Sequence, residues 1–155
     1  DYWMTEVSGI PFGLTGEMLE KGGKPYRGLL YGMTTRVYHN YNPGNLWKLF
    51  EDFGIAESRM IGYWVDNSPI KVDNKKIKCT VYQKEDKVMI TIASWSKKDE
   101  FLRLNIDWDK LGFDKSKSTL ISPMISGLQS RVELKVDQEI RVEKDRGIVL
   151  ILSKK

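Results

Sequence analysis

A chain of 155 residues has room for one ordinary domain, or for a β-domain with an appendage. Its 25 basic residues are interleaved with 21 acidic ones, so the net charge of +4 is spread along the sequence and predicts no nucleic-acid partner. No apolar stretch approaches the roughly 20 residues that a membrane-spanning helix needs, so no membrane span is expected.

Residues 1–62 are predicted to contain one strand and two helices between loops. Leu14–Glu20 suits a short helix with Thr15 as its N-cap. Tyr26–Met33 is a short apolar run bounded by glycine and polar residues, which favours a buried strand. Asn45–Phe53 is the clearest helix, because its apolar residues recur at helical spacing. A strand, a polar loop and an amphipathic helix make one βα unit, which belongs to a larger α/β body.

Lys75–Ser96 is predicted to form the hairpin around which the rest of the chain is organised. Apolar residues alternate with others along both arms, as is typical of strands: Ile77, Cys79, Val81, Val88, Ile90 and Ile92. Lys84–Lys87 carries a charge at every position, which suits a solvated turn. Cys79 should therefore be buried on the apolar face, whereas Lys78 and Thr80 should face solvent.

Further strands are predicted after the hairpin, from alternation or from continuous apolar runs: Phe101–Ile106, Thr119–Pro123, Arg131–Val136, Glu139–Val142 and Gly147–Ser153. One helical turn is expected between the first two, with Asp107 as its N-cap and Gly112 at its end. A single hairpin is marginal in water, so we expect these strands to pack with it. The sequence thus predicts an antiparallel β-sandwich over residues 63–155.

The chain holds one cysteine, Cys79, and one histidine, His39. No disulfide can form within it, and neither a zinc site nor a Cys–His nucleophile pair is supported. We therefore expect no metal and no cofactor. The chain begins at Asp1 with neither a methionine nor a charged, apolar leader, so a processed form or a piece of a longer protein is expected.

The tryptophans allow two interpretations, because a flat indole ring can stack on a sugar face or pack between segments of the protein. Several of them lie beside the helical stripe or at strand ends, which favours packing. We predict packing for the following residues: Trp3, Trp47, Trp64, Trp95 and Trp108.

Four sequence segments resemble the tail of bacterial glycoside-hydrolase-like proteins related to glycoside hydrolase family 123: RGLLYGMTTR, NLWKLFEDFGI, MIGYW and VYQKEDKVMITIASWS. In such proteins the last βα unit of a (β/α) barrel is followed by an antiparallel β-sandwich. The resemblance implies a mainly β chain, with residues 1–62 as the end of the barrel domain and residues 63–155 as the C-terminal β-sandwich.

Enzymes of family 123 are understood to act on N-acetylgalactosamine glycosides through an adjacent Asp–Glu pair, with the acetamido group of the substrate as nucleophile. Adjacent acids occur here at Glu51–Asp52, in reversed order on the predicted helix. They also occur at Asp99–Glu100, in a turn between sandwich strands. Both pairs suit solvent-facing positions, so the resemblance assigns no catalytic residue.

Thr34, Arg36 and Tyr38 follow the predicted strand of the βα unit. Because loops at the carboxyl ends of barrel strands build the active site, these residues are candidates for binding a sugar. The alternative is that Arg36 pairs with a carboxylate and Tyr38 packs at the domain junction.

The resemblance predicts a C-terminal fragment of a glycoside-hydrolase-like protein, in which the sandwich is a structural or accessory domain. Its partners would be carbohydrate, reached through the parent protein, and the remainder of the barrel domain. One alternative is a free-standing carbohydrate-binding β-sandwich, and another is a plain structural or interaction module. Coplanar exposed aromatic residues on one sheet face would favour binding, whereas an exposed apolar surface on residues 1–62 would favour a severed domain.

Overall fold

A computed structural model describes residues 24–33 and 42–155 of the chain. Its elements follow in chain order: α2 (Pro25–Leu29), α3 (Pro43–Phe53), β1 (Arg59–Ile61), β2 (Ile70–Val72), β3 (Ile77–Gln83), β4 (Lys87–Ser94), β5 (Glu100–Leu102), β6 (Leu104–Ile106), α4 (Trp108–Leu111), β7 (Ser118–Ser122), β8 (Val132–Leu134), β9 (Ile140–Val142) and β10 (Gly147–Lys154).

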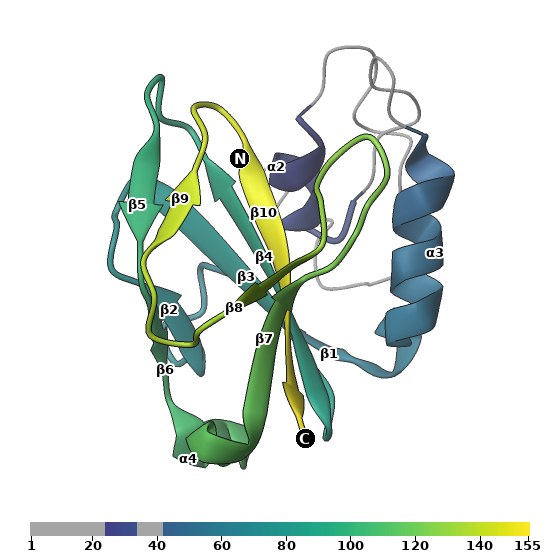
Figure 1. Ribbon diagram of the computed structural model, residues 1–155, viewed down its shortest axis with the longest axis vertical. Helices are drawn as coiled ribbons and strands as arrows, with labels where there is room; N and C mark the ends of the chain where they lie inside the picture. Colours follow the sequence, from purple (N-terminus) through teal and green to yellow (C-terminus); the bar gives the residue numbers. More distant parts are fainter. Residues whose placement is uncertain (1–23, 34–41) are drawn as a thin grey trace.

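The described residues form three layers (Figure 1). The middle layer is a six-stranded antiparallel sheet in the order β1-β3-β4-β10-β7-β8. Two small sheets, β2-β6 and β5-β9, lie on one side of it, and α2 and α3 lie on the other. The predicted mainly β fold with antiparallel sheets is confirmed.

The central hairpin is formed by β3 and β4, as predicted. The register places Cys79 opposite Ile92 and Val81 opposite Ile90. The turn closes with a hydrogen bond of 2.9 Å from the backbone N–H of Lys84 to the carbonyl of Lys87. Because β10 pairs with β4 from Gly147 to Ser153, the hairpin lies inside the sheet and not at its edge.

One face of the six-stranded sheet packs against the two small sheets and α4, and it is lined by apolar residues that include Ile77, Val81 and Ile90. Cys79 lies in the same row and is 5% exposed, so the prediction of its burial is confirmed. Burial raises the pKa of its thiol to about 12. Lys78, the residue before Cys79 on the strand, is exposed as expected.

The opposite face of the sheet lies under α2 and α3 (Figure 1). Thr80 is fully buried there, so the expectation that it faces solvent is wrong. Alternation along a strand separates two faces, but it does not tell whether helices cover the second. The hydroxyl of Thr80 donates to the carbonyl of Leu30 at 2.8 Å, and that of Tyr82 donates to the carbonyl of Leu29 at 2.7 Å. These hydroxyls satisfy carbonyls at the end of α2, which have no partner within the helix.

The strand predicted over Tyr26–Met33 is wrong, because the chain is helical at Pro25–Leu29 and then turns. The apolar run is buried, as expected, but it is too short to show a period. Pro25 occupies the first turn of the helix, where its missing N–H costs nothing. Gly32 has a φ of 75°, a left-handed conformation that ends the element.

The helix predicted over Asn45–Phe53 is confirmed as α3, which begins two residues earlier, at Pro43. The side chain of Asn42 caps it by accepting a hydrogen bond of 2.9 Å from the N–H of Gly44. Gly54, with a φ of 71°, ends the helix. Leu46 and Phe50 lie on its buried face and enter the core that the helices share with the sheet.

The single strand predicted over Phe101–Ile106 is two strands, β5 and β6, interrupted at Arg103. The two parts pair with different partners, β5 with β9 and β6 with β2, so they belong to different sheets. The helical turn that follows is as predicted, because the side chain of Asp107 accepts from the N–H of Lys110 at 3.1 Å and Gly112 ends the turn.

Candidate functional site

The sugar-binding residues proposed from the sequence, Thr34, Arg36 and Tyr38, lie outside the described residues and stay predictions. The same holds for His39 and for the short helix expected at Leu14–Glu20. A candidate site must therefore be sought on the helices and sheets described above.

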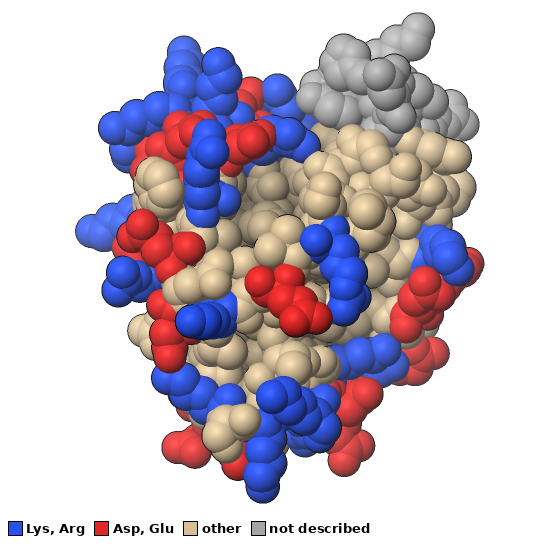
Figure 2. All heavy atoms as spheres, viewed as in Figure 1, with Lys and Arg blue, Asp and Glu red and all other residues tan. Residues whose placement is uncertain are grey.

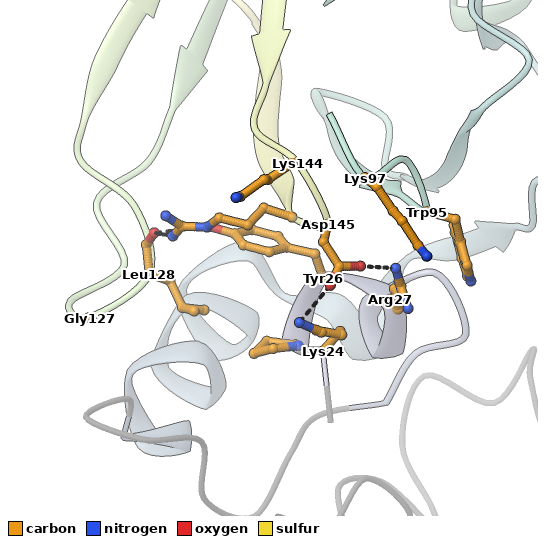
Figure 3. Close-up of a pocket in the computed structure, with 11 residues that line it drawn as sticks. Lys24, Tyr26, Arg27, Trp95, Lys97, Gly127, Leu128, Lys144 and Asp145 are labelled. Carbon is orange, nitrogen blue, oxygen red and sulfur yellow. Dashed lines mark hydrogen bonds and ion pairs between the residues drawn. The ribbon is translucent and has the colours of Figure 1, made fainter. Parts of the chain in front are cut away.

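A cavity of about 790 Å³ opens at one end of the six-stranded sheet (Figure 3). Four segments line it: the start of α2, the residues after β4, the loop before β8 and the turn before β10. They contribute Lys24, Pro25, Tyr26, Arg27, Trp95, Lys97, Gly127, Leu128, Lys144, Asp145 and Arg146. Basic side chains predominate in this lining, which holds one carboxylate.

Asp145 is the acidic centre of this cavity. Its carboxylate forms an ion pair with Lys24 at 2.7 Å and another with the guanidinium of Arg27. The hydrogen bond from Lys24 is the main reason that the pKa of Asp145 lies below its usual range, and the positive charge of Arg27 acts in the same direction. Asp145 also has a φ of 58°, a left-handed conformation that is uncommon outside glycine.

Arg27 links the ion pair to an aromatic wall of the cavity. Its guanidinium donates to the carbonyl of Ser94 at 3.2 Å and lies 4.7 Å from the centre of the Trp95 ring. Figure 3 shows Lys97 reaching toward the same place. Trp95 keeps 38% of its surface exposed, so this indole is held in position while part of it remains available to a ligand.

Tyr26 forms the inner wall of the cavity. Its hydroxyl donates to the carbonyl of Leu128 at 3.1 Å, and the same carbonyl accepts from the guanidinium of Arg146 at 2.8 Å. Burial raises the pKa of Tyr26 to about 12, so its hydroxyl stays protonated near neutral pH. The lining described here offers no nucleophile beside a base, and its chemistry is that of binding.

The acid pair Asp99–Glu100 is the one Asp–Glu dipeptide in the sequence, and its two carboxylates are bound to separate partners. Asp99 accepts from Arg141 at 2.6 Å and from the N–H of Lys144 at 2.9 Å. Both hydrogen bonds lower the pKa of Asp99, and the one from the backbone N–H of Lys144 has the largest effect.

Glu100 is buried, so the expectation that the Asp99–Glu100 pair faces solvent is wrong for this residue. Its carboxylate accepts three side-chain hydrogen bonds. They come from Ser96 at 2.7 Å, from Asn74 at 3.1 Å and from Lys76 at 3.1 Å. The bond from Ser96 is the largest cause, and together the three lower the pKa of Glu100 to about 2. Both members of the pair are therefore ionised and already bound.

The remaining adjacent acids lie on the surface. Glu51 and Asp52 are exposed on α3, where Asp52 lies 3.6 Å from Lys48 one helical turn earlier. Glu85 and Asp86, a third pair of adjacent acids, are exposed at the tip of the central hairpin. The prediction that Glu51–Asp52 faces solvent is confirmed.

The tryptophans differ in their surroundings. Trp64 stacks on Tyr31, with ring centres 5.8 Å apart and planes at 15°, and Trp108 packs against the core beneath the small sheets. Packing is thus confirmed for these two. Trp47 is half exposed on α3, and Trp95 lines the cavity. Trp3 lies outside the described residues.

The cavity could not be predicted from the sequence. Arg27 and Asp145 are 118 residues apart, and no spacing rule connects them. No partner could be assigned to the Asp145 side chain before the fold was known.

Among the described residues, no group of three His, Cys, Asp or Glu side chains could hold a metal ion. No helix found there is long and apolar enough to cross a membrane.

Comparison with known protein families gives two matches. The glycoside hydrolase 123 C-terminal domain matches residues 42–153, and the glycoside hydrolase 123 TIM-barrel domain matches residues 1–38. No curated protein matches the chain. The first match covers most of the sequence and contains the strands described above, except for the last residue of β10. The chain therefore belongs to the glycoside hydrolase 123 family, and most of it corresponds to the C-terminal domain of that family.

Proposed function

We propose that this chain is an accessory C-terminal part of a carbohydrate-active enzyme and that it carries no catalytic acid pair. The observation that supports this most directly is the state of Asp99 and Glu100. In hydrolysis assisted by an acetamido group, one carboxyl group must hold a proton to give to the leaving oxygen, which requires a raised pKa. The pKa values of Asp99 and Glu100 are both lowered, and both carboxylates already have partners.

The position of this pair also argues against a catalytic role. Asp99 precedes β5 and Glu100 begins it, in the small β5-β9 sheet. The partners of Asp99 come from β9 and the following turn, and those of Glu100 come from the residues around β3 and β4. These bonds connect neighbouring segments of the sandwich, so the pair has a structural role in holding β5 in place.

A hydrolysis assay tests the proposal. The purified 155-residue chain should release no measurable aryl alcohol from an aryl N-acetylgalactosaminide or an aryl N-acetylglucosaminide. Saturable hydrolysis that disappears in Asp99→Asn or Glu100→Gln, but persists in the surface variant Asp52→Asn, would overturn it. Circular dichroism of each variant distinguishes a loss of activity from a loss of folded structure.

We also propose that residues 63–155 form the sandwich domain and that residues 1–62 belong to the end of the barrel domain. The composition of the two cores supports this division. Apart from Ile61, the core between the sheets consists entirely of residues after position 62. The core under the helices instead combines residues from both parts, such as Phe50 with Met89.

Limited proteolysis should therefore cut before about Tyr63 and leave a resistant fragment that contains the hairpin. Mass spectrometry of the fragment gives its first residue. A fragment that begins near Asn42 would instead place the boundary where the two family matches meet. Early loss of the hairpin with survival of the first segment would contradict both divisions.

A further inference from the structure

A second, smaller cavity adjoins the one already described. It has a volume of about 210 Å³ and is lined by Tyr63, Lys75, Lys76, Lys78 and Trp95. Trp95 belongs to both linings, so the two cavities meet at its indole ring. Together they form a continuous surface at one end of the sheet, which we call the Trp95 surface.

The Trp95 surface is strongly basic for a protein with a net charge of +4. The larger cavity contributes Lys24, Arg27, Lys97, Lys144 and Arg146, and the smaller one contributes three lysines. Figure 2 shows Lys and Arg side chains gathered at the upper left of this face, with acidic side chains among them. The lining of both cavities includes one carboxylate, that of Asp145, which two of these cations already neutralise.

Not all of these cations are balanced by acids of the protein. Arg146 pairs with Glu143 at 2.9 Å, and Lys76 pairs with Glu100 at 3.1 Å. Lys97 and Lys144, by contrast, are exposed and have no carboxylate of the described residues within ion-pair distance, although the charge of Lys97 acts on Asp145 and that of Lys144 acts on Asp99. Their charge raises the local concentration of anionic ligands.

The aromatic and acidic groups of the surface favour a sugar over a nucleic acid. Trp95 offers a partly exposed flat ring, and Tyr63 lies beyond it with Lys78 5.4 Å from its ring centre. The carboxylate of Asp145 can accept hydrogen bonds from sugar hydroxyls, whereas a phosphodiester backbone has no donor to offer it. Membership in a glycoside hydrolase family points to the same ligand class.

We propose that the Trp95 surface binds a segment of an acidic polysaccharide, with carboxylate or sulfate groups at Lys97 and Lys144 and a sugar ring against Trp95. This inference goes beyond the accessory role. It is measured by binding and not by hydrolysis, so either proposal can fail without the other.

Isothermal titration calorimetry with the full 155-residue chain tests it, at 50 mM and 200 mM NaCl. The probes are polygalacturonate, which carries carboxylates, and dextran sulfate, which carries sulfates. Neutral dextran and a single-stranded oligodeoxynucleotide serve as the comparison ligands. We expect binding to at least one acidic polysaccharide that weakens with salt, and the stronger of the two identifies the acidic group.

Two double variants with the same change in net charge distinguish binding at the Trp95 surface from non-specific electrostatic binding. Lys97→Glu with Lys144→Glu should weaken binding at least tenfold, whereas Lys48→Glu with Lys135→Glu, at exposed positions outside both linings, should weaken it less than twofold. Trp95→Ala should weaken binding severalfold without a change in net charge.

Three results would overturn the proposal. They are equal losses in the two double variants, tighter binding of the oligodeoxynucleotide than of either acidic polysaccharide, and equal binding of neutral dextran. Absence of binding to both acidic polysaccharides at 50 mM NaCl would overturn it as well.

Discussion

Replacing Cys79 with aspartate should lower the free energy of unfolding by about 3 to 5 kcal/mol, because the substitution places an unpaired carboxylate in an apolar core. Cys79 is 5% exposed, and its neighbours on the same face are Ile77 and Val81. The native thiol should also react slowly with a thiol reagent, because burial raises its pKa to about 12 and hides the sulfur.

Lys78→Asp is the matched control, since it introduces the same side chain one residue earlier on the opposite face. Lys78 is exposed, and its contact with the Tyr63 ring at 5.4 Å is of the weak, solvated kind, so its loss should cost no more than about 1 kcal/mol. Urea unfolding of both variants gives the comparison. Equal costs, or labelling of Cys79 as fast as a free thiol without denaturant, would contradict the register of β3.

The cost of Cys79→Asp should also depend on pH. In the folded state burial raises the pKa of the new carboxyl group above its unfolded value, so the folded state binds more protons. The variant should therefore be closest to the parent protein below the unfolded pKa, near pH 3.5, and should lose stability as the pH rises toward 7. If the loss of unfolding free energy became smaller with rising pH, a cation would have to lie beside the new carboxylate.

The hairpin could be predicted from sequence because its determinants are local. The alternation of Ile77, Cys79 and Val81 with other residues defines the face, and the charged turn sets the pairing. The burial of Thr80 could not be predicted in this way. It depends on α2, whose carbonyls Thr80 contacts from 50 residues away.

The region before the sheet shows a second limit of prediction from sequence. The apolar run after Pro25 suits a buried strand as well as a buried helix, and only its neighbours decide between them. Pro25 in the first turn and Gly32 at the end were the available signals for a helix. Similarly, nothing in the alternation around Arg103 reveals that β5 and β6 pair with different strands.

The Trp95 surface is the feature that was least predictable from the sequence alone. Its lining comes from α2, Tyr63, the start of β3, the segment after β4, the loop before β8 and the turn before β10, and these segments share no sequence pattern. Ionic contacts across more than 100 residues join them, as between Arg27 and Asp145. The fold brings together side chains whose local sequence carries no common motif.

Gly147→Ala should be the most damaging substitution near that surface. A Cβ atom at this position would lie 2.0 Å from the backbone carbonyl oxygen of Ile92 and 2.5 Å from the Cβ of Tyr26, far inside normal contact distances. The carbonyl belongs to β4, which pairs with β10 from Gly147 onward, so it cannot move without disturbing the centre of the sheet. We expect the free energy of unfolding to fall by about 3 kcal/mol, the upper end of the usual cost of overpacking.

The matched control is Gly112→Ala. Gly112 has a φ of 66°, but a Cβ there would meet nothing within 4 Å, so this variant carries backbone strain without a clash and should cost about 1 kcal/mol. Urea unfolding compares the two. A displaced Tyr26 would also move the wall of the cavity. Gly147→Ala should therefore weaken the binding of a ligand beside Trp95, whereas Gly112→Ala should not. Equal stability of the two variants would mean that β10 does not pack as closely on Tyr26 and β4 as the structure places it.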